Sequence, residues 1–248
     1  MSGLSKKRHE GIRTMANLIG QRVTKKETHV AHSEPGRVDR SKFAVIVRTE
    51  PITWLMPFDE VCFSRAWRSQ MMLRMMPWDD LVTTENTYLL EARTKLWNDF
   101  HDMGLTNWAF MLDTDVATPP HYLHALLEHA RADPQKKVLA GWYRVKGEPF
   151  EPVVYHFVGD KKNPRGDPIS WWKQYGLDEI KTGLEKVDGM GAGCILIHHS
   201  VVRSIGRDPF VMHGGGEDLQ LCKILMEKNI PVWLDWDLAC AHVGVGTA

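Results

Sequence analysis

The clearest indication of the fold is Trp108-Ala-Phe-Met-Leu-Asp-Thr-Asp115, where an unbroken apolar run is followed directly by two carboxylates. A short apolar run of this kind is typical of a strand that is buried on both faces. Side chains alternate along a strand, so Asp113 and Asp115 can face the same way where the strand ends. In open α/β sheets, ligands bind at the carboxyl ends of the strands. The stretch therefore predicts an α/β sheet with a ligand site at these two acids.

Two carboxylates at a strand end offer hard oxygen ligands, which suit Mg²⁺ or Mn²⁺. Oxygens of a substrate diphosphate would complete the coordination shell of such an ion. An Asp-x-Asp pattern alone is weak, since it occurs by chance in many loops. Here it follows a buried strand and precedes Thr118-Pro-Pro120, which is typical of the first turn of a helix. This context favours a divalent metal site at Asp113 and Asp115.

Strands and helices alternate along the chain, which is typical of a single α/β domain. Apolar, β-branched runs predict further strands at residues 43–49, 80–84, 136–141, 153–158, 194–197 and 231–234. Apolar residues at helical spacing predict helices at residues 58–76, 87–103, 121–132 and 219–228. Pro51 and Pro57 are expected to break the chain between the first strand and the first helix. Residues 159–176 are polar and long enough to predict a loop that acts as a lid.

Composition indicates a folded protein without a membrane span. The chain has 248 residues, of which 43% are hydrophobic and 25% charged, so wholesale disorder is excluded. No apolar run approaches the roughly 20 residues that cross a bilayer. The segment Met1 to Lys7 is polar and no apolar stretch follows it, so we expect no secretory signal. Four cysteines lie far apart, which favours a reducing, cytoplasmic location.

Charge is divided unevenly between two parts of the chain. Residues 1–42 hold ten Lys or Arg against four Asp or Glu, a net charge of +6. Residues 43–248 hold 21 Lys or Arg against 27 Asp or Glu, a net charge of −6. We therefore predict a basic N-terminal extension at 1–42 and a catalytic domain at 43–248. Such an extension can contact nucleic acid or another anionic partner, and its composition also fits a solvated, partly disordered leader.

Two neighbouring tryptophans, Trp171 and Trp172, lie in the predicted loop. Exposed indole rings stack well on the faces of sugars, which would make them substrate contacts. Tryptophan is also a large core residue, so at least one of the two can be buried instead. The sequence leaves both interpretations open.

A glycine cluster, Val187-Asp-Gly-Met-Gly-Ala-Gly193, precedes the predicted strand at 194–197. Glycine lets the backbone approach a ligand closely or adopt a positive φ, so Gly191 is a candidate donor contact. The spacing does not match a dinucleotide-binding fingerprint, because these glycines precede a strand and do not open a helix.

A second glycine run, Gly214-Gly-Gly-Glu-Asp218, leads into the last predicted helix. Glu217 and Asp218 can be ordinary acids at a helix N-terminus, where they are favoured by the helix dipole. A flexible hinge before them can also carry them to a substrate. His242, near the C-terminus, has no special meaning alone.

Together these motifs resemble the GT-A glycosyltransferases, especially family 2-like members from bacteria and phages. The resemblance covers about residues 43–244. Its most specific parts are Phe110-Met-Leu-Asp-Thr-Asp115, Gly191-Ala-Gly-Cys-Ile-Leu196, Gly216-Glu-Asp218 and His242-Val-Gly244. It implies a Rossmann-like domain with a mixed central sheet flanked by helices, and a UDP- or GDP-sugar donor bound with Mn²⁺ or Mg²⁺.

The resemblance also assigns roles to the site residues. Asp115 would bind the metal directly, and His242 would be a further metal ligand. Asp113 would contact the ribose or a metal-bound water. Thr49 and Arg93 match positions that often touch the nucleotide.

Asp218 matches the catalytic base of these enzymes, with Glu217 beside it. The acceptor would be a protein or a glycan, or a nucleic acid held by the basic extension. The chain departs from the family in its first strand, which ends Val47-Arg-Thr-Glu-Pro51, and it lacks the Gln-x-x-Arg-Trp motif of processive synthases. These departures and the missing membrane helices favour an enzyme that transfers one sugar at a time.

Two other functions remain open on the sequence. A nucleotidyltransferase shares the sheet and the metal-binding acids, but it would need a glycine-rich phosphate loop after the first strand. A non-catalytic protein that binds sugar or nucleic acid would hydrolyse no nucleotide-sugar, even with metal present.

Overall fold

A computed structural model describes residues 50–58, 66–67, 69–70, 73, 75–85, 87–104, 106–166, 168–212 and 216–243. They fall within a single compact unit that spans Ile46–Ala248. In chain order, the strands are β1 Ile52–Phe58, β2 Asp80–Glu85, β3 Trp108–Leu112, β4 Val116–Ala117, β5 Val138–Trp142, β6 Val154–Lys162, β7 Pro168–Gln174, β8 Leu184–Val187, β9 Gly189–Met190, β10 Cys194–His198, β11 Val232–Ala239 and β12 Ala241–His242. The helices are α3 Leu89–Met103, α4 Tyr122–Ala132, the 3₁₀ turn η2 Leu177–Glu179, α5 His199–Ile205 and α6 Glu217–Glu227.

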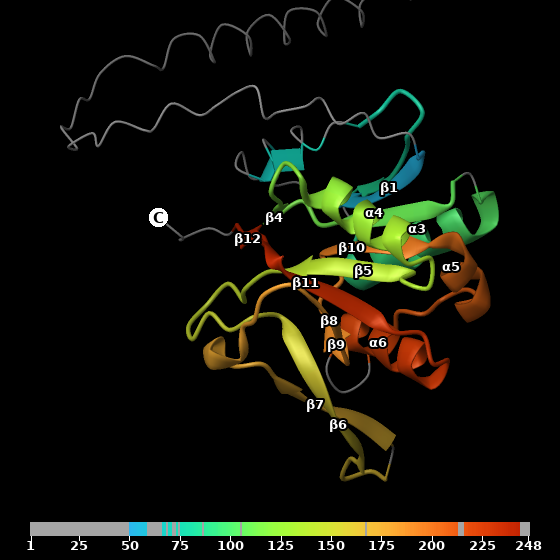
Figure 1. The fold of residues 1–248 in the computed structure, drawn as a ribbon. Helices are drawn as coiled ribbons and strands as arrows, with labels where there is room; N and C mark the ends of the chain where they lie inside the picture. Colours follow the sequence, from blue (N-terminus) through green and yellow to red (C-terminus); the bar gives the residue numbers. More distant parts are fainter. Residues whose placement is uncertain are drawn as a thin grey trace, which may run out of the picture. The chain divides into compact units, whose positions relative to one another are not determined.

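Seven strands form the central sheet, in the order β2-β1-β3-β10-β5-β11-β8. The pairs β1–β2, β1–β3 and β5–β11 are parallel, whereas β10 is antiparallel to both of its neighbours and β8 is antiparallel to β11. The strands β1, β2, β3, β5 and β11 therefore share one direction, and their carboxyl ends meet at one edge. The predicted mixed α/β sheet is confirmed (Figure 1).

Helices cover the two faces of this sheet and complete two hydrophobic clusters. One cluster joins α3, α5 and α6, and the other is built on α4. β3 contributes to both clusters, because Ala109 and Met111 face the first while Phe110 and Leu112 face the second. The prediction that 108–112 is a strand buried on both faces is confirmed.

The first described strand differs from the prediction. The expected strand at 43–49 lies outside the described residues, and β1 occupies the segment that Pro51 and Pro57 were expected to break. The pairing of β1 with β3 stops at Leu55, so at Pro57 the only paired neighbour is β2. The N–H that proline lacks therefore removes no hydrogen bond between β1 and β3. The helix predicted at 58–76 starts too early, since Phe58 ends β1. Helical turns appear at 66–67 and 69–70.

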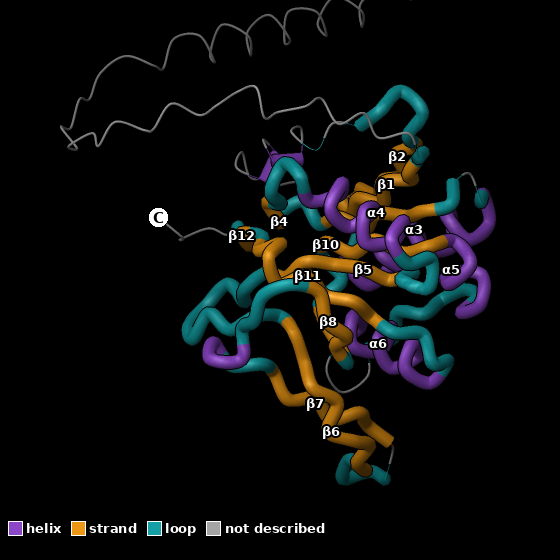
Figure 2. The backbone as a smooth tube through the Cα atoms, viewed as in Figure 1, coloured by secondary structure: helices purple, strands orange, loops and turns teal. Residues whose placement is uncertain are grey.

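The loop predicted at 159–176 is wrong, because most of this segment belongs to β6 and β7, which pair antiparallel. Figure 2 shows the two strands running side by side in the lower part of the view. The segment 159–176 is polar because one face of the β6–β7 hairpin is open to solvent. The two tryptophans divide accordingly: Trp171 is 46% exposed with Lys161 above its ring, whereas Trp172 packs against the α6 side of the core.

The other predicted elements are confirmed with small shifts of their ends. α3 stops at Gly104, which adopts the left-handed conformation with φ 57° that glycine commonly takes after a helix. Besides β7, the short elements β4, β8, β9, β12, η2 and α5 were not predicted. In the part of the chain that the structure describes, no helix has the length and apolar character needed to cross a membrane.

Candidate active site

The carboxyl edge of the central sheet collects the predicted site residues. Asp113 and Asp115 follow β3, and His242 follows β11. β10 runs antiparallel to β3, so the end of the glycine cluster before it reaches the same edge. Residues from the two halves of the chain therefore meet there, as expected for the ligand-binding edge of an open α/β sheet.

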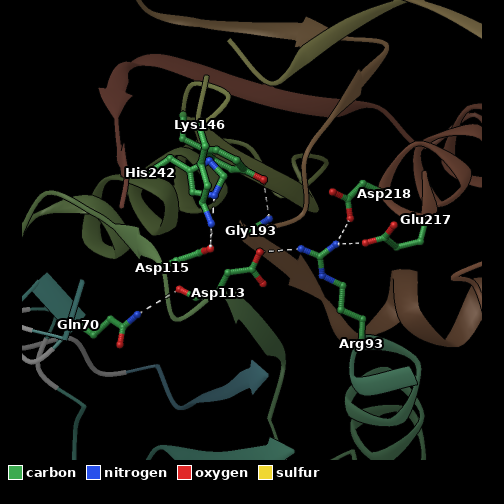
Figure 3. Close-up of polar contacts among 10 residues, drawn as sticks. Gln70, Arg93, Asp113, Asp115, Lys146, Gly193, Glu217, Asp218 and His242 are labelled. Atoms are coloured by element: carbon green, nitrogen blue, oxygen red, sulfur yellow. Dashed lines mark hydrogen bonds and ion pairs between the residues drawn. The ribbon is translucent and has the colours of Figure 1, made fainter. Parts of the chain in front are cut away.

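Asp115 and His242 are brought together by backbone pairing. β12 pairs with β4 so that His242 lies opposite Val116, and the Val243 amide donates to the Asp115 carbonyl at 2.8 Å. Asp115 Oδ2 then lies 3.5 Å from His242 Nε2 (Figure 3). His242 Nδ1 lies 3.0 Å from the Arg144 carbonyl, which can only accept, so Nδ1 carries the proton. Nε2 is the nitrogen left for a metal ion.

A lysine that the sequence motifs did not single out completes this group. Lys146 Nζ lies 2.6 Å from the same Oδ2 atom of Asp115. Burial alone would raise the pKa of Asp115, but its contacts with His242 and Lys146 outweigh burial and lower the pKa to about 2. Asp115 is therefore a carboxylate at every physiological pH.

A buried arginine links Asp113 to the start of α6. Arg93 on α3 is only 2% exposed, and its Nη2 lies 2.7 Å from Asp113 Oδ2. Its Nη1 lies 2.7 Å from Glu217 Oε1 and also donates to Asp218. Burial would lower the pKa of Arg93, but the carboxylates outweigh it and raise the pKa, so the guanidinium stays charged.

The carboxylates around Arg93 differ from ordinary surface acids. Burial raises the pKa of Asp113, although Arg93 opposes the shift. Burial also raises the pKa of Asp218 to about 6, again against Arg93 and with Glu217 and Asp113 adding to the rise. A carboxylate with a pKa near neutrality is the type of group that accepts protons in catalysis.

The residues present fit a divalent metal ion that is shared with a substrate. Asp115 Oδ2 and His242 Nε2 face one another, and Asp113 Oδ1 is buried without a hydrogen-bond partner among the described residues. Within the same residues, no three side chains of His, Cys, Asp or Glu cluster closely enough to hold an ion alone. The protein would thus supply part of the coordination shell, and substrate or water oxygens the rest.

The glycine cluster packs against the protein's own side chains. A Cβ at Gly191 would collide with the Tyr143 hydroxyl and Val153, and a Cβ at Gly193 would lie 2.9 Å from Asp113 Oδ2. The Gly193 amide donates to the Tyr143 hydroxyl at 3.2 Å. None of the cluster's glycines has a positive φ. Close approach to Tyr143 and Asp113 accounts for these glycines, while a donor contact at Gly191 stays a prediction.

The remaining predicted residues can be placed only in part. Thr49 lies outside the described residues, as do residues 213–215 before α6 and Gly244. Arg93 is buried in its ion-pair cluster, and its contact with a nucleotide stays a prediction. Lys146 and Tyr143 were missed because they belong to no motif. What could have identified them in the sequence is their position, because both follow the buried strand β5 at the ligand-binding edge.

The arrangement of strands and helices is a GT-A-like fold. The structure is similar to that of A197 from STIV, with a TM-score of 0.56 and 17% sequence identity over 78% of this chain and 86% of that chain. It is also similar to GalNAc-T7 with UDP, GalNAc and Mn²⁺, with a TM-score of 0.52 and 9% identity over 79% of this chain and 44% of that chain. No family model and no curated protein matches the sequence. At these identities the likeness shows the fold.

Proposed function

We propose that this protein is a family 2-like glycosyltransferase that moves a sugar from a UDP- or GDP-sugar to an acceptor hydroxyl with the help of Mn²⁺ or Mg²⁺. The proposal rests on one observation: a pair of possible metal ligands and a carboxylate that can act as a base lie at the same edge of the sheet. Asp115 and His242 offer a carboxylate and an imidazole to one point. Asp218, a carboxylate with a pKa of about 6, is tied through Arg93 to Asp113, which lies two residues from Asp115.

Asp115 and His242 are the proposed ligands of the divalent ion, with Asp113 beside them. Bound there, the ion neutralises the charge that develops on the departing nucleoside diphosphate. One carboxylate oxygen of Asp113 is fixed by Arg93, and the other has no hydrogen-bond partner among the described residues, so we assign it to the ribose or a metal-bound water. GalNAc-T7, which shares the fold, has been seen with UDP, GalNAc and Mn²⁺, and this supports the same kind of donor and metal here.

Asp218 is the proposed general base. Arg93 holds its Oδ1 atom, which fixes the orientation of the carboxylate at the start of α6. At pH 7 a carboxylate with a pKa of about 6 is mostly ionised, yet basic enough to take a proton from an attacking hydroxyl. Glu217 shares the Arg93 Nη1 atom with Asp218 and helps to keep that guanidinium in place.

Metal binding provides the direct test of the proposed ligands. Asp115→Ala and His242→Ala are each expected to weaken Mn²⁺ binding at least tenfold, because loss of even an indirect partner of a metal ligand costs roughly 10–100-fold. Isothermal titration calorimetry with Mn²⁺, in the presence of UDP and separately of GDP, measures the effect. Asp160→Ala is the matched control, since Asp160 also pairs with a lysine, Lys223, but lies on the β6–β7 hairpin. Equal Mn²⁺ affinity in all three variants would rule out this metal site.

A further inference from the structure

A pocket of unassigned function lies beside the proposed metal ligands. It has a volume of 360 Å³ and is formed where β5 and β11 end, with Trp142, Phe150, Cys240 and His242 among its walls. His242 thus belongs to both the pocket and the proposed metal site, and a ligand in the pocket would lie next to a bound ion.

The pocket is basic. Arg144 and Lys146 line it, and none of the described residues in its wall is acidic. The guanidinium carbon of Arg144 lies over the Trp142 ring, 5.8 Å from its centroid, and Arg144 makes no ion pair with any described carboxylate. A guanidinium in such a cation–π contact can still use its N–H groups to bind an anion. Glu148 and Glu151 occupy the same loop but do not line the pocket.

Lys146 and a metal ion would compete for the same atom. Asp115 Oδ2 contacts Lys146 Nζ at 2.6 Å and faces His242 Nε2 at 3.5 Å. An ion held between His242 Nε2 and Asp115 Oδ2 would therefore take over the oxygen that now binds the ammonium group. Lys146, which is 44% exposed, would then be free to turn toward the pocket beside Arg144.

We propose that Arg144 and Lys146 form a phosphate-binding subsite, in which metal binding at Asp115 releases Lys146 to contact the phosphate. This inference rests on the proposed function and deepens it, because it names two further residues that bind phosphate and couples one of them to the metal. The phosphate belongs either to the diphosphate of the donor or to a phosphorylated acceptor. Because metal and phosphate each favour the released lysine, each strengthens the binding of the other.

Calorimetry with pyrophosphate and with Mn²⁺ tests the subsite without any sugar transfer. Arg144→Met should weaken pyrophosphate binding by roughly 10–100-fold, as expected when a charge-assisted hydrogen bond is lost. Lys146→Met should bind Mn²⁺ alone about two- to fivefold more tightly, because it removes a competing exposed ion pair. The same variant should lose the tightening of pyrophosphate binding that Mn²⁺ causes in the unaltered protein. A purely structural role for Lys146 predicts no gain in Mn²⁺ affinity.

Lys181→Met is the matched control. Lys181 pairs with Glu185 at 2.8 Å, with side-chain exposures of 55% and 26% that resemble those of Lys146 and Asp115. If Arg144→Met and Lys146→Met bind pyrophosphate and Mn²⁺ as the control does, the proposal is overturned.

A competition experiment identifies the source of the phosphate. Displacement of pyrophosphate by UDP or GDP assigns the subsite to the donor, and simultaneous binding of both assigns it to the acceptor. Pyrophosphate binding needs no nucleotide-sugar. A protein that binds pyrophosphate through Arg144 but cleaves no nucleotide-sugar would therefore contradict the proposed function and leave the subsite standing.

Discussion

Asp218→Asn is expected to slow sugar transfer by roughly 10²–10⁴-fold, the usual cost of losing a general base, while donor affinity survives. The amide keeps the shape of the carboxylate but cannot accept the acceptor proton. Glu217→Gln is the matched control, because Glu217 bonds the same Arg93 nitrogen at the same helix start. It should lose less than about tenfold, since only an ion-pair partner is removed. If both variants lost the same fraction of the transfer rate, Asp218 would act only as an ion-pair partner of Arg93 and not as the base.

The pKa of Asp218 adds a pH dependence to this prediction. Burial raises that pKa to about 6, so the base is protonated below this pH and ionised above it. The transfer rate at saturating donor should therefore rise between pH 5 and pH 7 and then level off. The residual activity of Asp218→Asn should lack this rise. A flat profile in the unaltered protein would argue against Asp218 as the base.

Arg93→Met is expected to have the largest effect on stability. The change keeps a long side chain but leaves Asp113, Glu217 and Asp218 without their shared cation. Removal of one partner from a buried ion pair costs about 3–5 kcal/mol, which lowers Tm by roughly 5–20 °C for a domain of this size. Differential scanning calorimetry measures the shift.

Arg131→Met is the control for this change. Arg131 also bonds two carboxylates, those of Glu50 and Glu128, but it is 37% exposed, so its loss should cost less than about 1 kcal/mol. A similar small loss for Arg93→Met would show that the Arg93 cluster adds little to stability.

The stability loss in Arg93→Met should also depend on pH. Without the guanidinium, the folded-state pKa values of Asp113 and Asp218 rise further above those of the unfolded chain. Stability from a group with a raised folded-state pKa is present at low pH and is lost as pH rises through that pKa. The difference in Tm between Arg93→Met and the unaltered protein should therefore be larger at pH 8 than at pH 5.

The sequence predicted the buried parts of the fold well, for a physical reason. A strand such as β3 is buried on both faces, so nearly every residue is apolar and the pattern is unambiguous. Pro57 misled the prediction because the cost of a proline depends on which neighbour needs its N–H, and pairing partners are not visible in a sequence. The β6–β7 hairpin was missed because solvent on one face makes its composition that of a loop.

The candidate site was predictable where motif and strand end coincide. Asp113, Asp115 and His242 were singled out, and the structure brings them to one edge. The link from Arg93 to Asp218 was beyond the sequence, because it depends on how α3 and α6 pack across 125 residues of chain. Lys146 belongs to no sequence motif. Only the structure shows that Lys146 and His242 contact the same oxygen of Asp115.

On the proposed function, this edge of the sheet binds and cleaves a nucleotide-sugar with a divalent ion. The test is a panel of UDP- and GDP-sugars, incubated with the protein and Mn²⁺ and followed by chromatography of the released nucleoside diphosphate. We predict slow release from at least one donor, lost in excess EDTA and in Asp115→Ala. Release of pyrophosphate in place of nucleoside diphosphate would indicate a nucleotidyltransferase. No cleavage of any donor, or full cleavage in EDTA, would rule out a metal-dependent glycosyltransferase.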